Sequence, residues 1–259
     1  MIPYLSGRIG IMAAMPEELQ TLLDAMLDET VVVKAGRQFW VGHLCGREVV
    51  VVLSRIGKVA AAITTTVLLT DFGVDQVVFT GVAGGLGDGV RVGDVVVADA
   101  LIQHDMDASP LFPRFELPGL GTSTLQPPAD LTHLVHEAVQ QVLSLDSLAE
   151  GGALSGVHLD VLGLPQPKVH RGLIISGDQF INAATASAAL RQVLPQALAV
   201  EMEGAAVAQV CHDFGVPFAV IRTISDRADD DAHVDFPRFV SAVARHYSLA
   251  MVFALLRLQ

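Results

Sequence analysis

The chain has 259 residues, of which 51% are hydrophobic, and a formal net charge of −12 at pH 7. This composition supplies a sizeable core, and the length fits one large α/β domain or two small ones. The negative charge, with no cluster of Lys and Arg, argues against a nucleic-acid or anionic-membrane surface. The negative charge is more compatible with a small ligand that carries no phosphate, or with a cationic ligand.

The thiols and the apolar runs indicate the compartment. Cys45 and Cys211 stand in unrelated contexts, which is typical of unpaired thiols in a reducing compartment. Residues 9–15 are too short for the apolar part of a signal peptide. Residues 59–70 form another uncharged apolar stretch, which is far shorter than the roughly 20 residues of a membrane-spanning helix. We therefore expect a cytoplasmic protein with no membrane segment.

Apolar runs alternate with helical segments along most of the chain. Pro16 stands at the first helical position after an apolar run, and acidic residues follow it in the first turn. The alternation predicts one α/β domain over residues 1–259, a three-layer sandwich around a central mixed sheet. Strands are expected at 8–14, 31–33, 38–44, 48–53 (central), 76–80, 92–98, 169–176, 197–200 and 217–226, and helices at 16–27, 58–72, 129–145, 183–193, from 203 through 208, and 236–258.

Two segments interrupt the alternation. Residues 101–128 contain five prolines that break any regular element, and a loop of this length inside a compact domain is usually functional or disordered. Residues 146–168 are rich in Gly, Pro and Leu and are interpreted as a possible insertion of unassigned function. Residues 229–231, three consecutive Asp, predict an exposed acidic loop.

The segment 200–206 places two carboxylates between a strand and a helix. Glu201 and Glu203 stand near a helix N-terminus, where negative charge is favoured, so they are either helix caps or site residues. Arg222 lies within the next apolar strand, and a buried charge without a partner is unfavourable. The two glutamates are its nearest candidate partners. The sequence thus predicts a polar cluster at the C-terminal edge of adjacent strands, where open α/β sheets bind ligands.

Several kinds of chemistry are disfavoured by the motifs present. The glycine-rich residues 81–89 match neither dinucleotide nor P-loop spacing, and they predict either close backbone approach to a flat ligand or a tight turn. His104, His133, His136 and His233 lack convincing metal-ligand spacing. The chain has no G-x-S-x-G motif and no Cys with a placed His, which argues against covalent acyl transfer.

Carboxylates at strand and helix ends remain: Glu18, Glu201, Glu203 and Asp226. Carboxylates without a nucleophile or metal suit hydrolysis through an oxocarbenium-like transition state. One acid protonates the leaving group, one base activates water, and a negative environment favours the cationic sugar.

Six motifs extend this interpretation. They are residues 9–18 (IGIMAAMPEE), 54–61 (SRIGKVAA), 80–86 (TGVAGGL), 175–182 (ISGDQFIN), 200–206 (VEMEGAA) and 222–226 (RTISD). In this order they resemble the 5′-methylthioadenosine/S-adenosylhomocysteine nucleosidases of the purine nucleoside phosphorylase superfamily. The resemblance spans nearly the whole chain except 146–168. It implies a nucleoside phosphorylase-like fold, hydrolysis to adenine and thio-ribose, no cofactor or metal, and a homodimer.

The resemblance also implies roles for the acids. Glu18 matches the base that activates water at the anomeric carbon. Asp226 matches the acid that protonates purine N7, with Ser225 beside it. Glu203 matches the carboxylate that binds the ribose hydroxyls. From the residues alone, Glu18 as a mere helix cap stays an open alternative.

The remaining pocket follows from the same resemblance. Phe180 matches the ring stacked on adenine, although it could be a core residue, and the backbone of Ile181 matches the reader of the Watson–Crick edge. The other expected lining residues are Met15, Ile56 and Phe236 at the 5′-thio group, Glu201 and Met202 at the sugar, Val82 and Gly84 in the glycine-rich segment, and Arg222, expected to pair with Glu203 rather than to touch substrate. Phe112 and Pro118, in the 105–118 loop, would close the neighbouring subunit's pocket.

Two residues depart from the family pattern. Val82 stands where many members have Ser, which removes one possible hydrogen bond near Asp226. Arg55 stands where Gly is common, and it either points to solvent, the favoured interpretation, or binds phosphate as in a phosphorylase. Three alternatives to this nucleosidase remain: a phosphorylase, a futalosine-type nucleoside hydrolase and a non-catalytic nucleoside-binding module.

Overall fold

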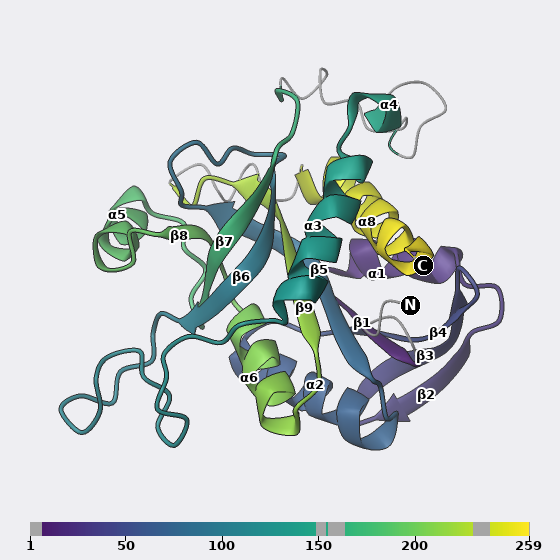
Figure 1. Cartoon of the computed structure of the whole chain (residues 1–259), viewed down its shortest axis with the longest axis horizontal. Helices are drawn as coiled ribbons and strands as arrows, with labels where there is room; N and C mark the ends of the chain where they lie inside the picture. Colours follow the sequence, from purple (N-terminus) through teal and green to yellow (C-terminus); the bar gives the residue numbers. More distant parts are fainter. Residues whose placement is uncertain (1–6, 149–153, 155–163, 230–238, 259) are drawn as a thin grey trace.

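A computed structural model describes residues 7–148, 154, 164–229 and 239–258. Nine strands within these residues form one mixed sheet (Figure 1). In sheet order they are β2 (Thr30–Lys34), β3 (Arg37–Leu44), β4 (Arg47–Leu53), β1 (Ile9–Ala13), β5 (Gln76–Gly85), β8 (Ala197–Glu201), β7 (Val169–Ser176), β6 (Val95–Gln103) and β9 (Phe218–Asp226).

The second half of the sheet closes on itself. Strand β9 pairs with β6 at the end of the strand order and also runs parallel to β5, so β5, β8, β7, β6 and β9 form a ring. Strand β8 meets β5 over a short antiparallel crossing at its C-terminal end. Gly84 of β5 consequently pairs with Val200 on one side and Asp226 on the other.

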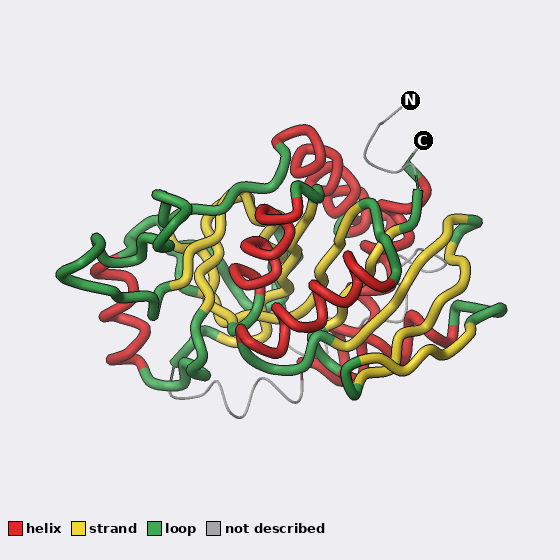
Figure 2. The backbone as a smooth tube through the Cα atoms, turned by 90° about the horizontal axis from the view of Figure 1, so that it is seen from below, coloured by secondary structure: helices red, strands yellow, loops and turns green. Residues whose placement is uncertain are grey.

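Helices cover both faces of the sheet, as the three-layer prediction requires (Figures 1 and 2). Helices α2 (Lys58–Asp71) and α6 (Gly204–Phe214) pack together on one face. On the other face α8 (Arg245–Arg257) packs against α1 (Pro16–Asp24) and α3 (Ala129–Val142). The short α4 (Leu145–Leu148), α5 (Ala184–Val193) and the π-helix η2 (Val240–Ala244) complete the described elements.

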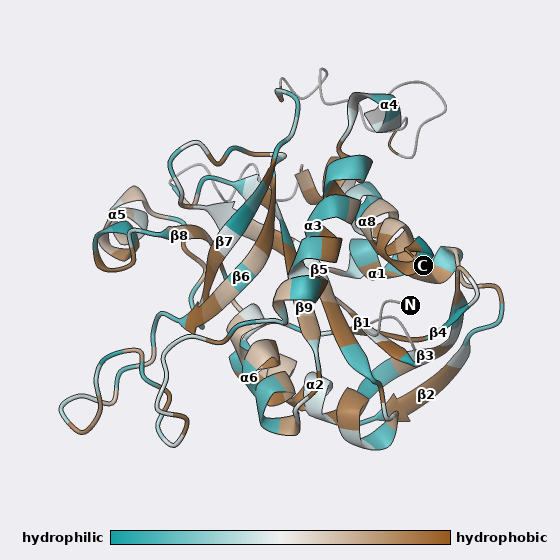
Figure 3. Cartoon of the chain, viewed as in Figure 1, coloured by the Kyte–Doolittle hydropathy of each residue, from teal (hydrophilic) through white to brown (hydrophobic). Residues whose placement is uncertain are grey.

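The two faces carry separate apolar cores because side chains alternate along each strand. In β1, Ile9 and Ile11 belong to the core under α1, α3 and α8, whereas Met12 belongs to the core under α2 and α6. Figure 3 shows the hydrophobic colour along the inner strands and hydrophilic patches on the helices. The expected α/β fold with a mixed central sheet is confirmed. The strand expected at 48–53, β4, has neighbours on both sides.

Several element predictions need correction. The glycine-rich residues 81–85 do not form a turn but continue β5 to Gly85. The strand expected at 92–98 is shifted to Val95–Gln103, and the first helix ends at Asp24, before residue 27. Strands β8 and β9, which were expected to be adjacent, are separated by β5. Within the helix expected at 236–258, the described part opens with a π-helical turn.

The proline-rich segment leaves the body of the molecule as an extended loop, visible at the lower left of Figure 1. Leu111, Phe112 and Pro118 on this loop are exposed, Leu111 to 83%. The proposed insertion at 146–168 and the acidic run at 229–231 lie largely outside the described residues. Among the helices that the structure describes, none is long and apolar enough to span a bilayer.

Candidate active site

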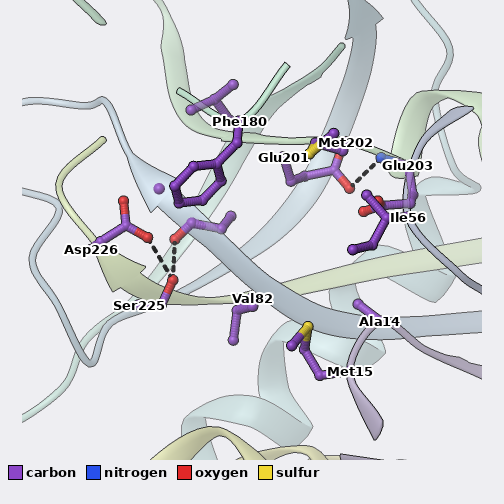
Figure 4. Close-up of a pocket in the computed structure, with 13 residues that line it drawn as sticks. Ala14, Met15, Ile56, Val82, Phe180, Glu201, Met202, Glu203, Ser225 and Asp226 are labelled. Atoms are coloured by element: carbon purple, nitrogen blue, oxygen red, sulfur yellow. Dashed lines mark hydrogen bonds between the residues drawn. The ribbon is translucent and has the colours of Figure 1, made fainter. Parts of the chain in front are cut away.

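A cavity of about 470 Å³ opens where β1, β5, β8 and β9 end (Figure 4). Apolar side chains dominate its walls, and carboxylates project into it. Its lining residues are Ala14, Met15, Ile56, Val82, Ala83, Gly84, Phe180, Val200, Glu201, Met202, Glu203, Ser225 and Asp226. Ten residues that the sequence predicted are therefore gathered at one place. Ile181 lines a smaller depression that shares Phe180 and Asp226 with the cavity.

Other predicted residues lie outside the cavity lining. Glu18 and Arg222 are fully buried behind the wall. Phe112 and Pro118 sit on the projecting loop, with Phe112 38% exposed. Phe236, like His233, falls outside the described residues.

Glu18 is held from two directions. One carboxylate oxygen accepts the Met15 N–H at 3.0 Å, and the other accepts the Ser248 hydroxyl at 2.8 Å. Ser248 comes from α8 and also lies 3.0 Å from the Thr80 hydroxyl of β5. The Met15 contact is a helix-capping bond, but full burial and the Ser248 contact exceed what capping requires. No local pattern in the sequence marked Ser248, because it enters the site from the last helix.

Burial raises the pKa of Glu18 above its ordinary value. The hydrogen bonds from Ser248 and Met15 and the positive charge of Arg222 oppose that rise. A carboxylate with a raised pKa is a better base at neutral pH than an exposed one. Glu18 therefore has the environment of a general base.

Asp226 ends β9 with its carboxylate oriented by two donors. The Ser225 hydroxyl donates to one oxygen at 2.8 Å, and the Ala228 N–H donates to the other at 2.8 Å (Figure 4 shows the first bond). Val82 lines the cavity nearby and contributes no donor to this carboxylate. The Asp226 network therefore forms without a hydroxyl at position 82.

Glu203 is the residue that precedes α6, and it lines the cavity. The Glu203 carboxylate accepts a hydrogen bond from the Gly57 N–H at 2.9 Å, and Glu203 is only 7% exposed. Burial, followed by the nearby charge of Glu201, raises the pKa of Glu203 to about 7, against the opposing effects of Arg222 and the Gly57 N–H.

The expected pairing of Arg222 with Glu203 is wrong, because its carboxylate partner is Glu201. The Arg222 guanidinium donates to Glu201 at 2.7 and 3.3 Å and lies 4.0 Å above the Phe79 ring. Glu201 is the last residue of β8, and the antiparallel crossing of β8 over β5 brings it close to Arg222 on β9, which pairs with the other edge of β5. The two-residue turn then directs Glu203 away, toward Gly57.

Glu201 also fulfils the capping alternative. Its carboxylate accepts the N–H of Glu203 at 3.1 Å and the N–H of Gly204 at 2.8 Å, and it receives the Ser176 hydroxyl. The N-terminus of α6 thereby gains a negative charge where the helix dipole favours one. Glu201 lines the cavity, but its oxygens are engaged by the protein itself.

Two further alternatives are resolved by position. Phe180 is 47% exposed and lines the cavity, so it is not a core residue. Arg55 is exposed, and its guanidinium donates to the Gly36 carbonyl at the β2–β3 turn, outside the cavity. Over the residues that the structure describes, no group of three or more His, Cys, Asp or Glu side chains is arranged to hold a metal.

Comparison with known proteins identifies the family. The Phosphorylase superfamily profile matches residues 8–257. The 5′-methylthioadenosine/S-adenosylhomocysteine nucleosidase of Shewanella putrefaciens is 37% identical over 254 residues, which cover 97% of this chain and 100% of that protein. The chain belongs to the 5′-methylthioadenosine/S-adenosylhomocysteine nucleosidase family.

Solved structures agree with this membership. The nucleosidase of Neisseria meningitidis in complex with methylthio-immucillin-A superposes with a TM-score of 0.83 at 32% identity, covering 96% of this chain and 98% of that one. The futalosine hydrolase of Helicobacter pylori superposes with a TM-score of 0.81 at 32% identity, covering 97% and 98%. The resemblance to this nucleosidase family and the nucleoside phosphorylase-like fold are therefore confirmed.

Proposed function

We propose that this protein hydrolyses the N-glycosidic bond of 5′-methylthioadenosine and S-adenosylhomocysteine, releasing adenine and the thio-ribose. The observation that carries the proposal is that Glu203 and Asp226 line one apolar cavity with an aromatic wall, while the buried Glu18 lies directly behind the lining residue Met15, whose N–H it accepts. The family membership supports the same reaction class and makes the protein a nucleosidase.

In the proposed mechanism Asp226 protonates purine N7, so that adenine leaves as a neutral base. Glu18 takes a proton from the water that attacks the anomeric carbon. Glu203 accepts hydrogen bonds from the ribose hydroxyls, and its negative charge favours the oxocarbenium-like transition state. We propose that these proton transfers proceed without a cofactor or metal.

Different residues of the cavity contact different parts of the substrate in this proposal. We propose that Phe180 stacks on the purine, with the Ile181 backbone at its Watson–Crick edge and Ser225 supporting Asp226. Met202 and Glu201 lie along the sugar, and Met15 and Ile56 accept the 5′-thio group. We also propose that Val82 and Gly84 form the floor of the cavity and that Phe236 contributes to the pocket for the 5′ group. Arg222 lies behind Glu201.

Three broader statements belong to the same proposal. We propose a single nucleosidase domain, supported by the one sheet that all described strands share. A homodimer, in which the 105–118 loop with Phe112 and Pro118 completes the neighbour's pocket, is supported by the exposed apolar side chains on that loop. The unpaired Cys45 and Cys211 favour a cytoplasmic location. The acidic charge disfavours a nucleic-acid partner.

The direct test is incubation with methylthioadenosine in phosphate-free buffer, with free adenine and thio-ribose measured by chromatography. Hydrolysis predicts equal release with and without phosphate. Strict dependence on phosphate would instead identify a phosphorylase, an outcome that the position of Arg55 outside the cavity argues against. Nucleoside binding without adenine release would identify a binding module and reject the enzyme.

Futalosine-type nucleosides are a second candidate substrate class, because the futalosine hydrolase of Helicobacter pylori has a closely similar structure. The side chains at the 5′ end of the cavity decide between the classes. Met15 and Ile56 are apolar and match a thioether substituent. We therefore expect a higher kcat/KM for methylthioadenosine, and a higher kcat/KM for futalosine would reverse the assignment.

A further inference from the structure

Three side chains beside the cavity form an ion cluster that the proposed mechanism does not use. They are Lys58 at the start of α2, Asp105 just after β6, and Asp178 in the loop after β7. Lys58 Nζ lies 2.5 Å from Asp105 and 3.7 Å from Asp178. Segments separated by 47 and 120 residues along the chain therefore meet at one ammonium group.

Backbone donors close the cluster. The Lys58 N–H donates to the Asp178 carboxylate at 2.8 Å, and the Asp178 N–H donates to the Asp105 carboxylate at 2.9 Å. Each carboxylate thus accepts a hydrogen bond from a backbone N–H and also forms an ion pair with the ammonium. Such reciprocal charge-assisted bonds fix the relative positions of the loops themselves, and not only of the side-chain tips.

Two of the three side chains are partly withdrawn from water, and the third, that of Asp178, is 50% exposed. The Lys58 side chain is 16% exposed and that of Asp105 31%. Burial alone would raise the pKa of Asp105, but the hydrogen bonds from Lys58 and the Asp178 N–H outweigh it, so the pKa lies below its ordinary value. Asp105 is therefore ionised at neutral pH, and solvent screens this pair less than a fully exposed one.

The cluster adjoins both halves of the proposed substrate site. Lys58 directly follows Gly57, whose N–H holds Glu203. Asp178 stands two residues before Phe180, which lines the cavity. A displacement of the cluster therefore moves the ribose carboxylate and the purine-facing ring relative to each other.

We propose that Lys58, Asp105 and Asp178 are positioning residues that hold the purine loop and the ribose-binding Glu203 at the spacing of a nucleoside. This inference rests on the proposed function. The Phe180 ring and the hydroxyl contacts of Glu203 bind parts of the substrate that do not react, so their misplacement weakens the ground state and the transition state alike. The negative charge of Glu203, which favours the transition state, is retained in these variants. The expected signature is a raised KM with a nearly unchanged kcat.

The test compares Asp105→Asn, Lys58→Met, the double variant and Lys58→Arg. Asparagine retains one acceptor oxygen and loses the charge, methionine retains the stem of Lys58 and loses the ammonium, and arginine restores the cation. We expect KM and the dissociation constant of adenine, measured by calorimetry, to rise on the order of tenfold in Asp105→Asn and in Lys58→Met. The KM of the double variant should be little higher than that of the single variant with the higher KM, because the two substitutions remove the same interaction. Lys58→Arg should recover most of the affinity.

The matched control is a second Lys–Asp pair far from the cavity. Lys34 lies 3.3 Å from Asp71 across β2 and α2, so Lys34→Met and Asp71→Asn remove the same chemistry without touching the substrate site. The controls should leave KM unchanged. An unchanged KM in Asp105→Asn and Lys58→Met, or a fall in kcat and melting temperature with no change in KM, would overturn the inference.

Failure of the proposed function is distinguishable from failure of the cluster. If the unaltered protein released no adenine, the nucleosidase proposal would fall, whereas the adenine affinities of the variants would still report on the cluster. If the unaltered protein is active and the variants bind adenine as tightly, the cluster inference alone is wrong.

Discussion

Glu18 and Glu203 are both carboxylates whose pKa burial raises, yet the protein surrounds them differently. Glu18 receives a hydroxyl from α8, whereas Glu203 faces the like charge of Glu201. The first arrangement orients a base, and the second makes ionisation unfavourable until a ligand supplies donors. Two titratable groups with different environments, one lining a cavity and one directly behind its wall, are typical of an active site.

Replacing Glu18 with Gln removes the proposed base and preserves the shape of the side chain. We expect kcat to fall by roughly 10²–10⁴ while the KM for methylthioadenosine changes little, because water activation contributes mainly to the transition state. The matched control is Glu17→Gln, an exposed neighbour on the same helix. Full activity in Glu18→Gln would remove this residue from the mechanism.

The pKa of Glu203 makes stability depend on pH. The unfolded chain ionises this group near 4.5, whereas the folded protein retains the proton until about 7. The folded state therefore binds more protons in this window, and the free energy of unfolding falls as pH rises from 4.5 to 7. Above that window the loss is complete and corresponds to roughly 3 kcal/mol.

Glu203→Gln lacks this ionisation. We expect its free energy of unfolding, measured in urea, to gain on that of the unaltered protein as pH rises through this window, while its KM for nucleoside increases. Exposed Glu29 supplies the control, since Glu29→Gln should show no such divergence. Parallel stability curves for Glu203→Gln and the unaltered protein would contradict the assignment.

The same ionisation should shape activity. The ribose hydroxyls need an ionised acceptor, so kcat/KM should increase as pH rises through about 7. Ionisation of Glu18, whose pKa burial also raises, should add its own increase of kcat/KM with pH. In Glu203→Gln only the Glu18 contribution should remain. An identical limb in both proteins, measured as kcat/KM against pH, would exclude Glu203 from ribose binding.

At the scale of elements, the packing around β5 explains why this strand contains glycines. A Cβ at Gly81 would lie 2.8 Å from the Cβ of Ala14 and 3.1 Å from the Arg222 guanidinium. A Cβ at Gly84 would lie 2.9 Å from the Cβ of Ala228 and 3.0 Å from a carboxylate oxygen of Asp226. The glycines therefore provide room for the polar side chains of β9.

Gly84→Ala should displace the Asp226 carboxylate. Because proton donation requires that carboxylate at a fixed position, we expect turnover to fall by about 10–10² with the fold intact. Gly85→Ala is the control, since its Cβ would meet a methyl of Ile224 at 3.1 Å and no carboxylate. Equal turnover in the two variants would show that room at Gly84 is unimportant.

The sequence predicted the participants of the polar cluster better than its pairing. An Arg inside an apolar strand requires an anion, and two glutamates stood at a strand end, so the cluster was foreseeable. The choice of Glu201 over Glu203 depends on the short crossing of β8 over β5, which no local pattern specifies. The continuation of β5 through its glycines depends in the same way on side chains of β9.

At the scale of the whole molecule, the 105–118 loop is notable because packing within one chain does not explain its exposed apolar side chains. Leu111 and Phe112 are exposed on a segment that extends from the body. Exposed apolar side chains gathered on one segment indicate an interaction site. The sequence predicted an irregular loop from its prolines, but its local pattern does not show how far the apolar side chains of the loop project from the body. Ser248 escaped prediction for a related reason, since only tertiary packing brings α8 to Glu18.

The loop yields a prediction about assembly. We expect light scattering to give twice the chain mass for the unaltered protein, and Phe112→Ser to weaken the dimer and raise the KM for methylthioadenosine severalfold. Exposed Phe214, at the end of α6, provides the control as Phe214→Ser. A fully active monomer at assay concentration would contradict the proposed dimer.

The central claim is that three carboxylates direct water, and not phosphate, to the anomeric carbon. The most direct measurement is turnover of methylthioadenosine in heavy-oxygen water containing ordinary phosphate, with the sugar reduced by borohydride as it forms and then weighed by mass spectrometry. The account predicts free adenine and a reduced thio-sugar that carries one heavy oxygen. A thio-sugar 1-phosphate, or no adenine at all, would contradict it.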